Sequence, residues 1–177
     1  YSKLGLQMLG LLSTGLLLGY ARGKRNRKKL LDDCDKIWHS IDRDQLFKIL
    51  HTLKLKKFIQ VVKKNDLENV TLTSSGKYRA RQYLIDKIEI TKSKKWDGKW
   101  RVVIYDIPEG RKKLRDAFRR HLKRLGFYEF QKSVFVMPHP CEEEITSLIN
   151  LLDLVDSVHC LESHIPHDKI LRNFFSL

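Results

Sequence analysis

Residues 96–137 read WDGKWRVVIYDIPEGRKKLRDAFRRHLKRLGFYEFQKSVFVM, and this stretch decides the fold of the second half of the chain. The apolar run 100–107 predicts a strand that delivers Asp106 close to its end, and Pro108 breaks the strand. Residues 111–125 then have apolar side chains at helical spacing, and Gly126 ends this helix. The runs 127–131 and 133–137 predict two short strands. The stretch therefore begins strand, helix, strand, strand.

The residues after this stretch add a second helix and a fourth strand. Pro138 and Pro140 interrupt the chain, and the acidic run 142–144 suits the first turn of a helix because of the helix dipole. Residues 157–161 predict the last strand, and residues 168–175 a short terminal helix or arm. The order strand, helix, strand, strand, helix, strand is that of the ferredoxin-like fold.

The first half has a different pattern, which begins with helices. Asp42 and Gln45 have the spacing of a capping box, and an apolar stripe that begins at Leu46 predicts a helix after them. The strand-like runs FIQVV and VTLT follow, separated by the polar linker 63–69, and Thr73 or Ser74 then begins a further helix. This order predicts a winged helix-turn-helix domain. The whole chain is thus expected to be α+β, with a winged helix-turn-helix domain over 1–90, a linker over 91–98 and a ferredoxin-like domain over 99–177.

Basic residues are concentrated in the first half of the chain. The formal net charge is +14; residues 1–95 hold 22 Lys and Arg against 9 Asp and Glu, whereas residues 96–177 hold 13 against 12. This asymmetry indicates a polyanionic partner, either nucleic acid or an anionic membrane, or a basic surface that only keeps the protein in solution. If the partner is double-stranded DNA, the helix after Asp42 would enter the major groove, and the hairpin formed by the two strand-like runs would touch phosphate. The residues predicted to make these contacts are Arg43, Lys48, His51, Thr52, Lys63 and Lys64.

Residues 4–20, LGLQMLGLLSTGLLLGY, are rich in Leu and Gly and precede a basic segment. A run of 17 residues is at the lower length limit for a membrane-spanning helix, and this one contains polar Gln7, Ser13 and Thr14. A buried helix explains the run equally well by periodicity. The buried helix is the interpretation adopted, with a membrane anchor as the alternative.

Cysteine and histidine do not follow a metal-binding pattern in this sequence. Cys34, Cys141 and Cys160 are an odd number without close spacing, which is typical of a reducing cytoplasm rather than of a disulfide framework. The candidate zinc ligands lack the paired spacing of a structural zinc site, so no zinc is expected. These candidates are His139, Cys141, His159, Cys160, His164 and His167.

The motifs WRVVIYDIPE at 100–109 and LKRLGFYEFQKSVFVMP at 122–138 resemble the CRISPR-associated Cas-two family, a group of small ferredoxin-like adaptation proteins. The same domain forms the middle of PaaX-type transcriptional repressors, where it follows a winged helix with an LT-x-x-G motif. Leu72–Gly76, LTSSG, fits that motif, and WDGKWR at 96–101 is more similar to the PaaX group. PaaX repressors continue into a C-terminal domain that is missing from these 177 residues, so an acyl-CoA response is not carried over.

The resemblance implies two functions that differ in the role of Asp106. In the Cas-two family, the matching aspartate is assigned to a magnesium-dependent nuclease and is shared across a dimer axis. In a PaaX-type repressor, the same residue would only cap the helix after Pro108, and this is the interpretation we favour. The main prediction is therefore a homodimeric, cytoplasmic, prokaryotic DNA-binding repressor without a cofactor. The alternative is a metal-dependent endonuclease of CRISPR adaptation, with Asp106 as magnesium ligand and a CRISPR integrase subunit as partner.

Overall fold

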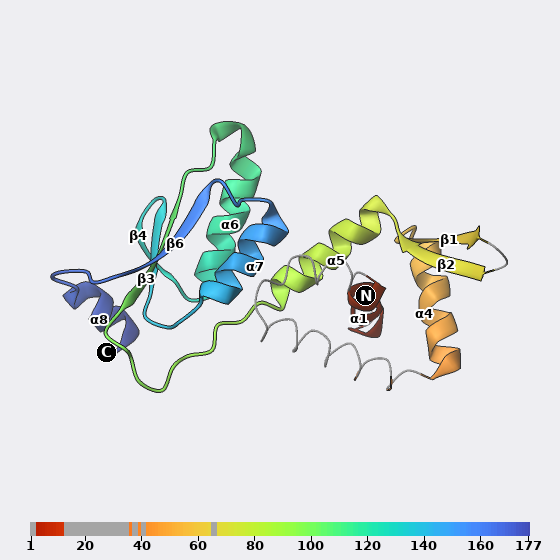
Figure 1. Ribbon diagram of the computed structural model, residues 1–177, viewed down its shortest axis with the longest axis horizontal. Helices are drawn as coiled ribbons and strands as arrows, with labels where there is room; N and C mark the ends of the chain where they lie inside the picture. Colours follow the sequence, from red (N-terminus) through yellow and green to blue (C-terminus); the bar gives the residue numbers. More distant parts are fainter. Residues whose placement is uncertain (1–2, 13–35, 37–38, 40–41, 65–66) are drawn as a thin grey trace. The chain divides into compact units, whose positions relative to one another are not determined.

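The computed structural model describes residues 3–12, 36, 39, 42–64 and 67–177. The chain divides into two compact units, residues 1–87 and 88–177 (Figure 1). Each unit contains helices and an antiparallel sheet, so the expected α+β class is confirmed.

The described part of the first unit consists of helices around one hairpin. Its elements are α1 (Lys3–Leu12), α4 (Arg43–Leu55), β1 (Ile59–Lys64), β2 (Leu67–Leu72) and α5 (Ser74–Asp86). β1 and β2 are antiparallel, with Ile59 opposite Leu72. The buried core draws on all three helices and on β1, and consists of Met8, Leu9, Ile49, Leu53, Ile59 and Ala80.

Helix α1 covers the first part of the apolar run 4–20, and its residues Met8 and Leu9 are buried in this core. Residues 13–20 lie outside the described residues. Among the helices that are described, none has the length and hydropathy that a membrane crossing requires. The contacts of α1 with α4 and α5 agree with the expected buried helix for residues 3–12.

The start of α5 is joined closely to the start of β1. Thr73 is the N-cap of α5, because its Oγ1 accepts a hydrogen bond from the backbone N–H of Gly76 at 3.1 Å. The same hydroxyl donates to the carbonyl of Lys57 at 2.6 Å, and the Thr73 N–H donates to the carbonyl of Phe58 at 3.0 Å. The LTSSG motif therefore joins the start of α5 to Lys57 and Phe58, the residues directly before the first strand of the hairpin.

The second unit is a four-stranded antiparallel sheet with helices on both sides. Its elements are β3 (Trp100–Tyr105), the 3-10 turn η1 (Glu109–Arg111), α6 (Lys112–Arg124), β4 (Tyr128–Gln131), β5 (Val134–Met137), α7 (Glu142–Leu152), β6 (Val158–Ser163) and α8 (Lys169–Phe175). The strand order is β4-β5-β3-β6. Figure 1 shows α6 and α7 on one side of this sheet and α8 on the other. The first strand ends at Tyr105, before the expected position 107, and Pro108, which has no N–H to donate, follows two residues after Asp106.

The terminal helix α8 is held on the sheet by the WDGKWR segment. Trp100 donates its indole N–H to Asp168 Oδ2 at 2.9 Å, and its ring lies 5.9 Å from that of Phe175. Trp96 lies 4.8 Å from Trp100 by ring centroids, and the Arg172 guanidinium lies 4.6 Å from the Trp96 centroid. Trp96, which falls inside the expected linker 91–98, thus packs as part of the second unit.

Candidate nucleic-acid interface

Helix α4, the predicted reading helix, begins where the sequence places it. The side-chain oxygen Oδ1 of Asp42 accepts a hydrogen bond from the N–H of Gln45 at 2.8 Å, which satisfies one of the free donors of the first turn. The N-cap predicted from Asp42 and Gln45 is confirmed. Ile41 and Leu46 also have the spacing of a hydrophobic staple, but Ile41 lies outside the described residues.

The two faces of α4 differ sharply. Ile49 and Leu53 are buried against α1 and β1, which fixes the rotation of the helix about its axis. The opposite face exposes Lys48 and His51 to solvent, as predicted. The same helix also exposes two large apolar side chains, Phe47 and Leu55, at 58% and 71%. The outer face of α4 is therefore mixed, with cationic, imidazole and apolar groups within three turns.

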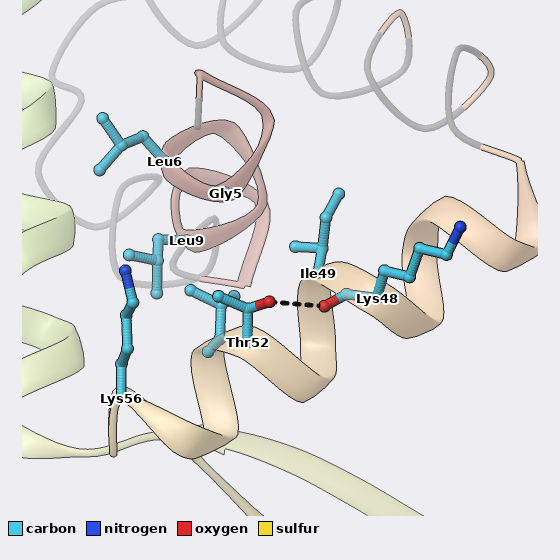
Figure 2. Close-up of a pocket in the computed structure, with 8 residues that line it drawn as sticks. Gly5, Leu6, Leu9, Lys48, Ile49, Thr52 and Lys56 are labelled. Atoms are coloured by element: carbon cyan, nitrogen blue, oxygen red, sulfur yellow. Dashed lines mark hydrogen bonds between the residues drawn. The ribbon is translucent and has the colours of Figure 1, made fainter. Parts of the chain in front are cut away.

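Lys48, Thr52 and Lys56 form a row at four-residue spacing along one edge of α4. With Gly5, Leu6, Leu9, Ile49 and Leu53 they line a hollow of about 190 Å³ between α1 and α4 (Figure 2). The Thr52 hydroxyl donates to the carbonyl of Lys48 at 2.8 Å, so its hydrogen is used within the helix. Of the predicted contacts, Thr52 is therefore the least suited to donate to a base edge, whereas Lys56 extends the row beyond the residues predicted to contact DNA.

Two of the residues predicted to contact phosphate lie beside the turn of the hairpin. Lys63 and Lys64 are the last residues of β1, and their Cα atoms pair with those of Glu68 and Leu67. The side chains of Lys63 and Lys64, and that of Arg43, lie outside the described residues. The backbone thus brings the two lysines together at the tip of the hairpin, at the opposite end of β1 from α4.

Asp106 follows the last residue of β3 and is exposed to solvent. Its backbone N–H donates to the carbonyl of Ser157 at 2.9 Å. Neither η1 nor α6 has a side-chain N-cap hydrogen bond, so the expectation that Asp106 caps the next helix is wrong. The reason is that Pro108 and the 3-10 turn separate Asp106 from the first N–H groups of α6.

The nearest acidic partner in the following loop does not complete a metal site. Glu109 accepts a hydrogen bond from Arg115 at 2.6 Å, and this contact lowers the pKa of the Glu109 carboxyl. Within the described ranges, no group of three His, Cys, Asp or Glu side chains could hold a metal ion. Magnesium needs several oxygen ligands. Within one chain, Glu109 is thus engaged by Arg115, and a magnesium ion at Asp106 would need further oxygen ligands from a second copy of the chain or from water.

Helix α6 is basic, but part of its charge is neutralised within the second unit. Arg119 and Lys123 both form ion pairs with Glu129 of β4, the latter at 2.6 Å. These contacts, that of Lys123 first, lower the pKa of Glu129. Lys112 and Lys113 at the start of the helix are exposed. Of the basic side chains of α6, those of the first turn are therefore exposed, whereas Arg119 and Lys123 are engaged by Glu129.

Among the residues that the structure describes, the His and Cys side chains considered as zinc ligands do not form a metal-binding group. Cys141 is buried and Cys160 is partly buried. His139 has a different role, since its Nδ1 accepts from the Ser93 N–H at 3.2 Å. Burial lowers the pKa of His139, which favours the neutral imidazole that can accept this bond.

Comparison with known families assigns most of the second unit. Residues 93–173 match the family model described as the PaaX protein central Cas2-like domain. No curated protein matches the chain. The matched range contains all four strands of the second sheet, both helices on one side of it and the WDGKWR segment. The resemblance based on these motifs is confirmed, because residues 93–173 of the second unit match the PaaX central Cas2-like domain.

Proposed function

We propose that this protein is a DNA-binding transcriptional regulator, a repressor of the PaaX type that acts as a homodimer. The observation that carries the proposal is the joining of a PaaX central domain to a separate, basic, helix–hairpin–helix unit. A family domain alone does not specify activity, so the argument depends on the surfaces of the two units.

The order of elements in the described part of the first unit supports a winged helix. Helix α4 is followed by the hairpin β1-β2 and then by α5, which is the order of a winged helix-turn-helix domain. Its buried stripe leaves Lys48 and His51 on the outer face, where a major groove would meet them. We infer that α4 reads bases and that the hairpin tip with Lys63 and Lys64 contacts the phosphate backbone.

Charge supports the same assignment. Residues 1–87 contain 19 Lys and Arg against 8 Asp and Glu, whereas residues 88–177 contain 16 against 13. Phosphate neutralisation by Lys and Arg releases counterions, and this provides sequence-independent affinity that weakens as salt rises. The excess positive charge therefore favours the first unit as the DNA-binding part.

The second unit supports the dimer. Its strand order and antiparallel pairing are those of a ferredoxin-like βαββαβ sheet. Ile104 and Leu161 are 38% and 50% exposed on the face that α8 only partly covers. Pairing two copies through this apolar area would present two copies of α4 to a two-fold symmetric DNA site.

Replacing Lys63 and Lys64 together by alanine is expected to weaken binding to any duplex. Each lost phosphate contact should reduce the slope of log affinity against log salt by about 0.9. Fluorescence anisotropy with a random-sequence duplex, measured over a series of salt concentrations, gives this slope. The matched control is Lys112→Ala with Lys113→Ala, an adjacent exposed pair in the second unit.

The same binding assay distinguishes the base contact proposed for His51 from the phosphate contacts proposed for Lys63 and Lys64. His51→Ala should leave the salt slope unchanged but relax the preference among sequences selected from a random library, by roughly 1–3 kcal/mol at one position. Sedimentation of the selected complex should give two chains per duplex. Equal loss for the Lys63/Lys64 and Lys112/Lys113 variants, with no effect of His51→Ala, would contradict the proposal.

Asp106 provides the test of the nuclease alternative, because an exposed carboxylate at the end of β3 is the feature that favours it. We expect no magnesium-dependent cleavage of single- or double-stranded DNA or RNA, since Glu109 is engaged by Arg115. Asp106→Asn and the wild-type chain should therefore behave alike in the presence of magnesium and of chelator. Cleavage that chelator stops and Asp106→Asn abolishes would replace the regulator proposal by a nuclease.

A further inference from the structure

The solvent side of α4 carries a row of side chains that includes two large apolar groups. Ile49 and Leu53 are buried, and they fix which side of the helix faces solvent. On that side, Phe47 is 58% exposed, and His51 and Leu55, both also exposed, follow it at four-residue spacing. Residues at this spacing lie on one face of a helix. Phe47, His51 and Leu55 therefore form an outer row along α4.

Phe47 is the member of the outer row that lies closest to the start of the helix. α4 begins at Arg43, and the hydrogen bond from the N–H of Gln45 to Asp42 caps this start. Recognition helices of helix-turn-helix proteins contact base edges through their N-terminal residues. Leu55 is the last residue of α4. If α4 enters a major groove, Phe47 is therefore placed to reach a base, whereas Leu55 lies at the end that leads into the hairpin.

The chemistry of this side of α4 suits base edges better than phosphate. A surface that only follows the phosphate backbone presents cations and neutral hydrogen-bond donors. α4 instead exposes the phenyl ring of Phe47 and the carboxylate of Asp44 together with the cation of Lys48. A phenyl ring makes no favourable contact with phosphate, but in the major groove it packs well against the C5-methyl group of thymine. The excess positive charge of the first unit attracts a duplex without any contribution from Phe47.

We propose that Phe47 is a specificity-determining residue, which reads an A·T base pair by contact of its ring with the thymine methyl group. This inference rests on the proposed function, because it requires α4 to lie in the major groove of DNA. It narrows the partner from double-stranded DNA in general to duplexes with a thymine at the position that Phe47 contacts. A homodimer would read one such thymine in each half-site.

The expected effect is that of burying one methyl group, which changes an equilibrium constant by a factor of about four. Phe47 is more than half exposed, so its ring has apolar surface left to bury against a base. Among the described residues, the core of the first unit is formed without Phe47. Alanine at this position is therefore expected to leave the fold intact and to change only the preference for thymine.

The experiment uses the full chain and a duplex that it selects from a random-sequence library. Each thymine of the selected site is replaced in turn by deoxyuridine, which still pairs with adenine but lacks the C5-methyl group. Fluorescence anisotropy at constant salt gives the affinity for each duplex. We expect one position in each half-site at which the wild type loses affinity about fourfold. Phe47→Ala should bind the thymine and deoxyuridine duplexes equally at that position, and Phe47→Leu should retain part of the difference.

Phe130→Ala is the matched control, because Phe130 is a 47% exposed phenylalanine of β4 in the second unit. This variant should distinguish thymine from deoxyuridine as the wild type does. Circular dichroism shows that each variant is folded. The salt dependence of binding to a random-sequence duplex should be the same for Phe47→Ala as for the wild type, because the phosphate contacts are kept.

The outcomes separate this inference from the proposed function. Salt-dependent binding with equal affinity for thymine and deoxyuridine at every position would overturn the inference and leave a DNA-binding regulator in place. A thymine preference that persists in Phe47→Ala would assign the methyl contact to another residue and would overturn it too. If Phe47→Ala also changed the sedimentation of the free chain, Phe47 would belong to a protein interface. Absence of binding to any duplex would overturn the proposed function, and this inference with it.

Discussion

Gly76→Ala is expected to unfold the first unit or to leave it severely destabilised, by about 3 kcal/mol or more. A Cβ placed on Gly76 would lie 1.9 Å from the carbonyl oxygen of Phe58 and 2.9 Å from its carbonyl carbon. Both atoms belong to the backbone, so no side-chain rotation relieves the overlap. The two segments can only separate.

Separation of these segments breaks the contacts that position the hairpin. The Phe58 carbonyl accepts the N–H of Thr73 at 3.0 Å and also lies 3.2 Å from the Thr73 hydroxyl. Moving it away removes both bonds, together with the close approach of α5 to the start of β1. Because Gly76 is buried, water does not readily replace what is lost.

Urea unfolding followed by far-ultraviolet circular dichroism, with the full chain, measures the effect. The matched control is Gly110→Ala, where an added Cβ meets nothing within 4 Å. We expect the control to be close to neutral, and the second-unit transition to persist in both variants. A Gly76→Ala chain with an unchanged first transition would show that α5 and β1 tolerate separation. If the first unit binds DNA, binding should be lost in this variant alone.

The parts of the fold that could be predicted are those set by local sequence. The Asp42 cap, the inner stripe with Ile49 and Leu53, and the Thr73 cap all depend on residues within a few positions of one another. Local patterns do not show which strands pair. Arg101 lies opposite Glu162 in the β3–β6 ladder, and only that pairing brings the guanidinium to its distant carboxylate. The packing of Trp96 against Arg172 of α8 is not predictable for the same reason, because α8 lies at the other end of the unit in sequence.

In the candidate interface too, local sequence patterns predict which residues are exposed but not all of their contacts. Helical spacing correctly predicts that Lys48 and His51 are exposed. The same spacing places Thr52 outward, but its hydroxyl donates a hydrogen bond to the carbonyl of Lys48. This local pattern is common for threonine in helices. The neutralisation of Lys123 by Glu129 was not predictable from spacing, because it depends on how β4 returns beside α6.

Arg101→Met is expected to destabilise the second unit by about 3 kcal/mol. The Arg101 side chain is 4% exposed and forms a two-point contact with Asp97, at 2.8 and 2.7 Å. It also donates to Glu142, to Glu162 and to the carbonyl of Pro138, the last at 3.3 Å in a buried setting. Methionine fills much of the volume but donates no hydrogen bond, so the penalty is electrostatic.

The size of this penalty depends on how well water solvates the carboxylates that lose their contact with Arg101. The carboxylates of Asp97, Glu142 and Glu162 are each 42–46% exposed, so water partly solvates them once the guanidinium is gone. Their mutual repulsion and the unpaired Pro138 carbonyl remain. Lys99→Met is the matched control, because Lys99 pairs with Glu162 at 2.7 Å through side chains that are both nearly half exposed. An exposed pair of this kind contributes about 1 kcal/mol or less.

Acid unfolding gives the Arg101 contact a signature that a loss of packing would not produce. Its hydrogen bonds lower the pKa of Asp97 from 3.8 to about 2. A carboxyl whose pKa is lower in the folded state stabilises the fold above its unfolded pKa, and this contribution is lost as the pH falls toward 2. The free energy of unfolding of the wild type should therefore fall through this window. In Arg101→Met the fall should be shallower, because Asp97 then titrates nearly alike in both states.

A double variant distinguishes charge from volume. If the loss in Arg101→Met comes from the carboxylates that no longer contact the guanidinium, then adding Asp97→Asn should recover part of it at neutral pH, since one negative charge is removed from the cluster. In the wild-type background, Asp97→Asn should instead destabilise, because it breaks the two-point contact with Arg101. This change of sign is expected only if the guanidinium and the carboxylates act as one network. A loss of the same size in both backgrounds would mean that Arg101 holds β3, α7 and β6 together by packing alone.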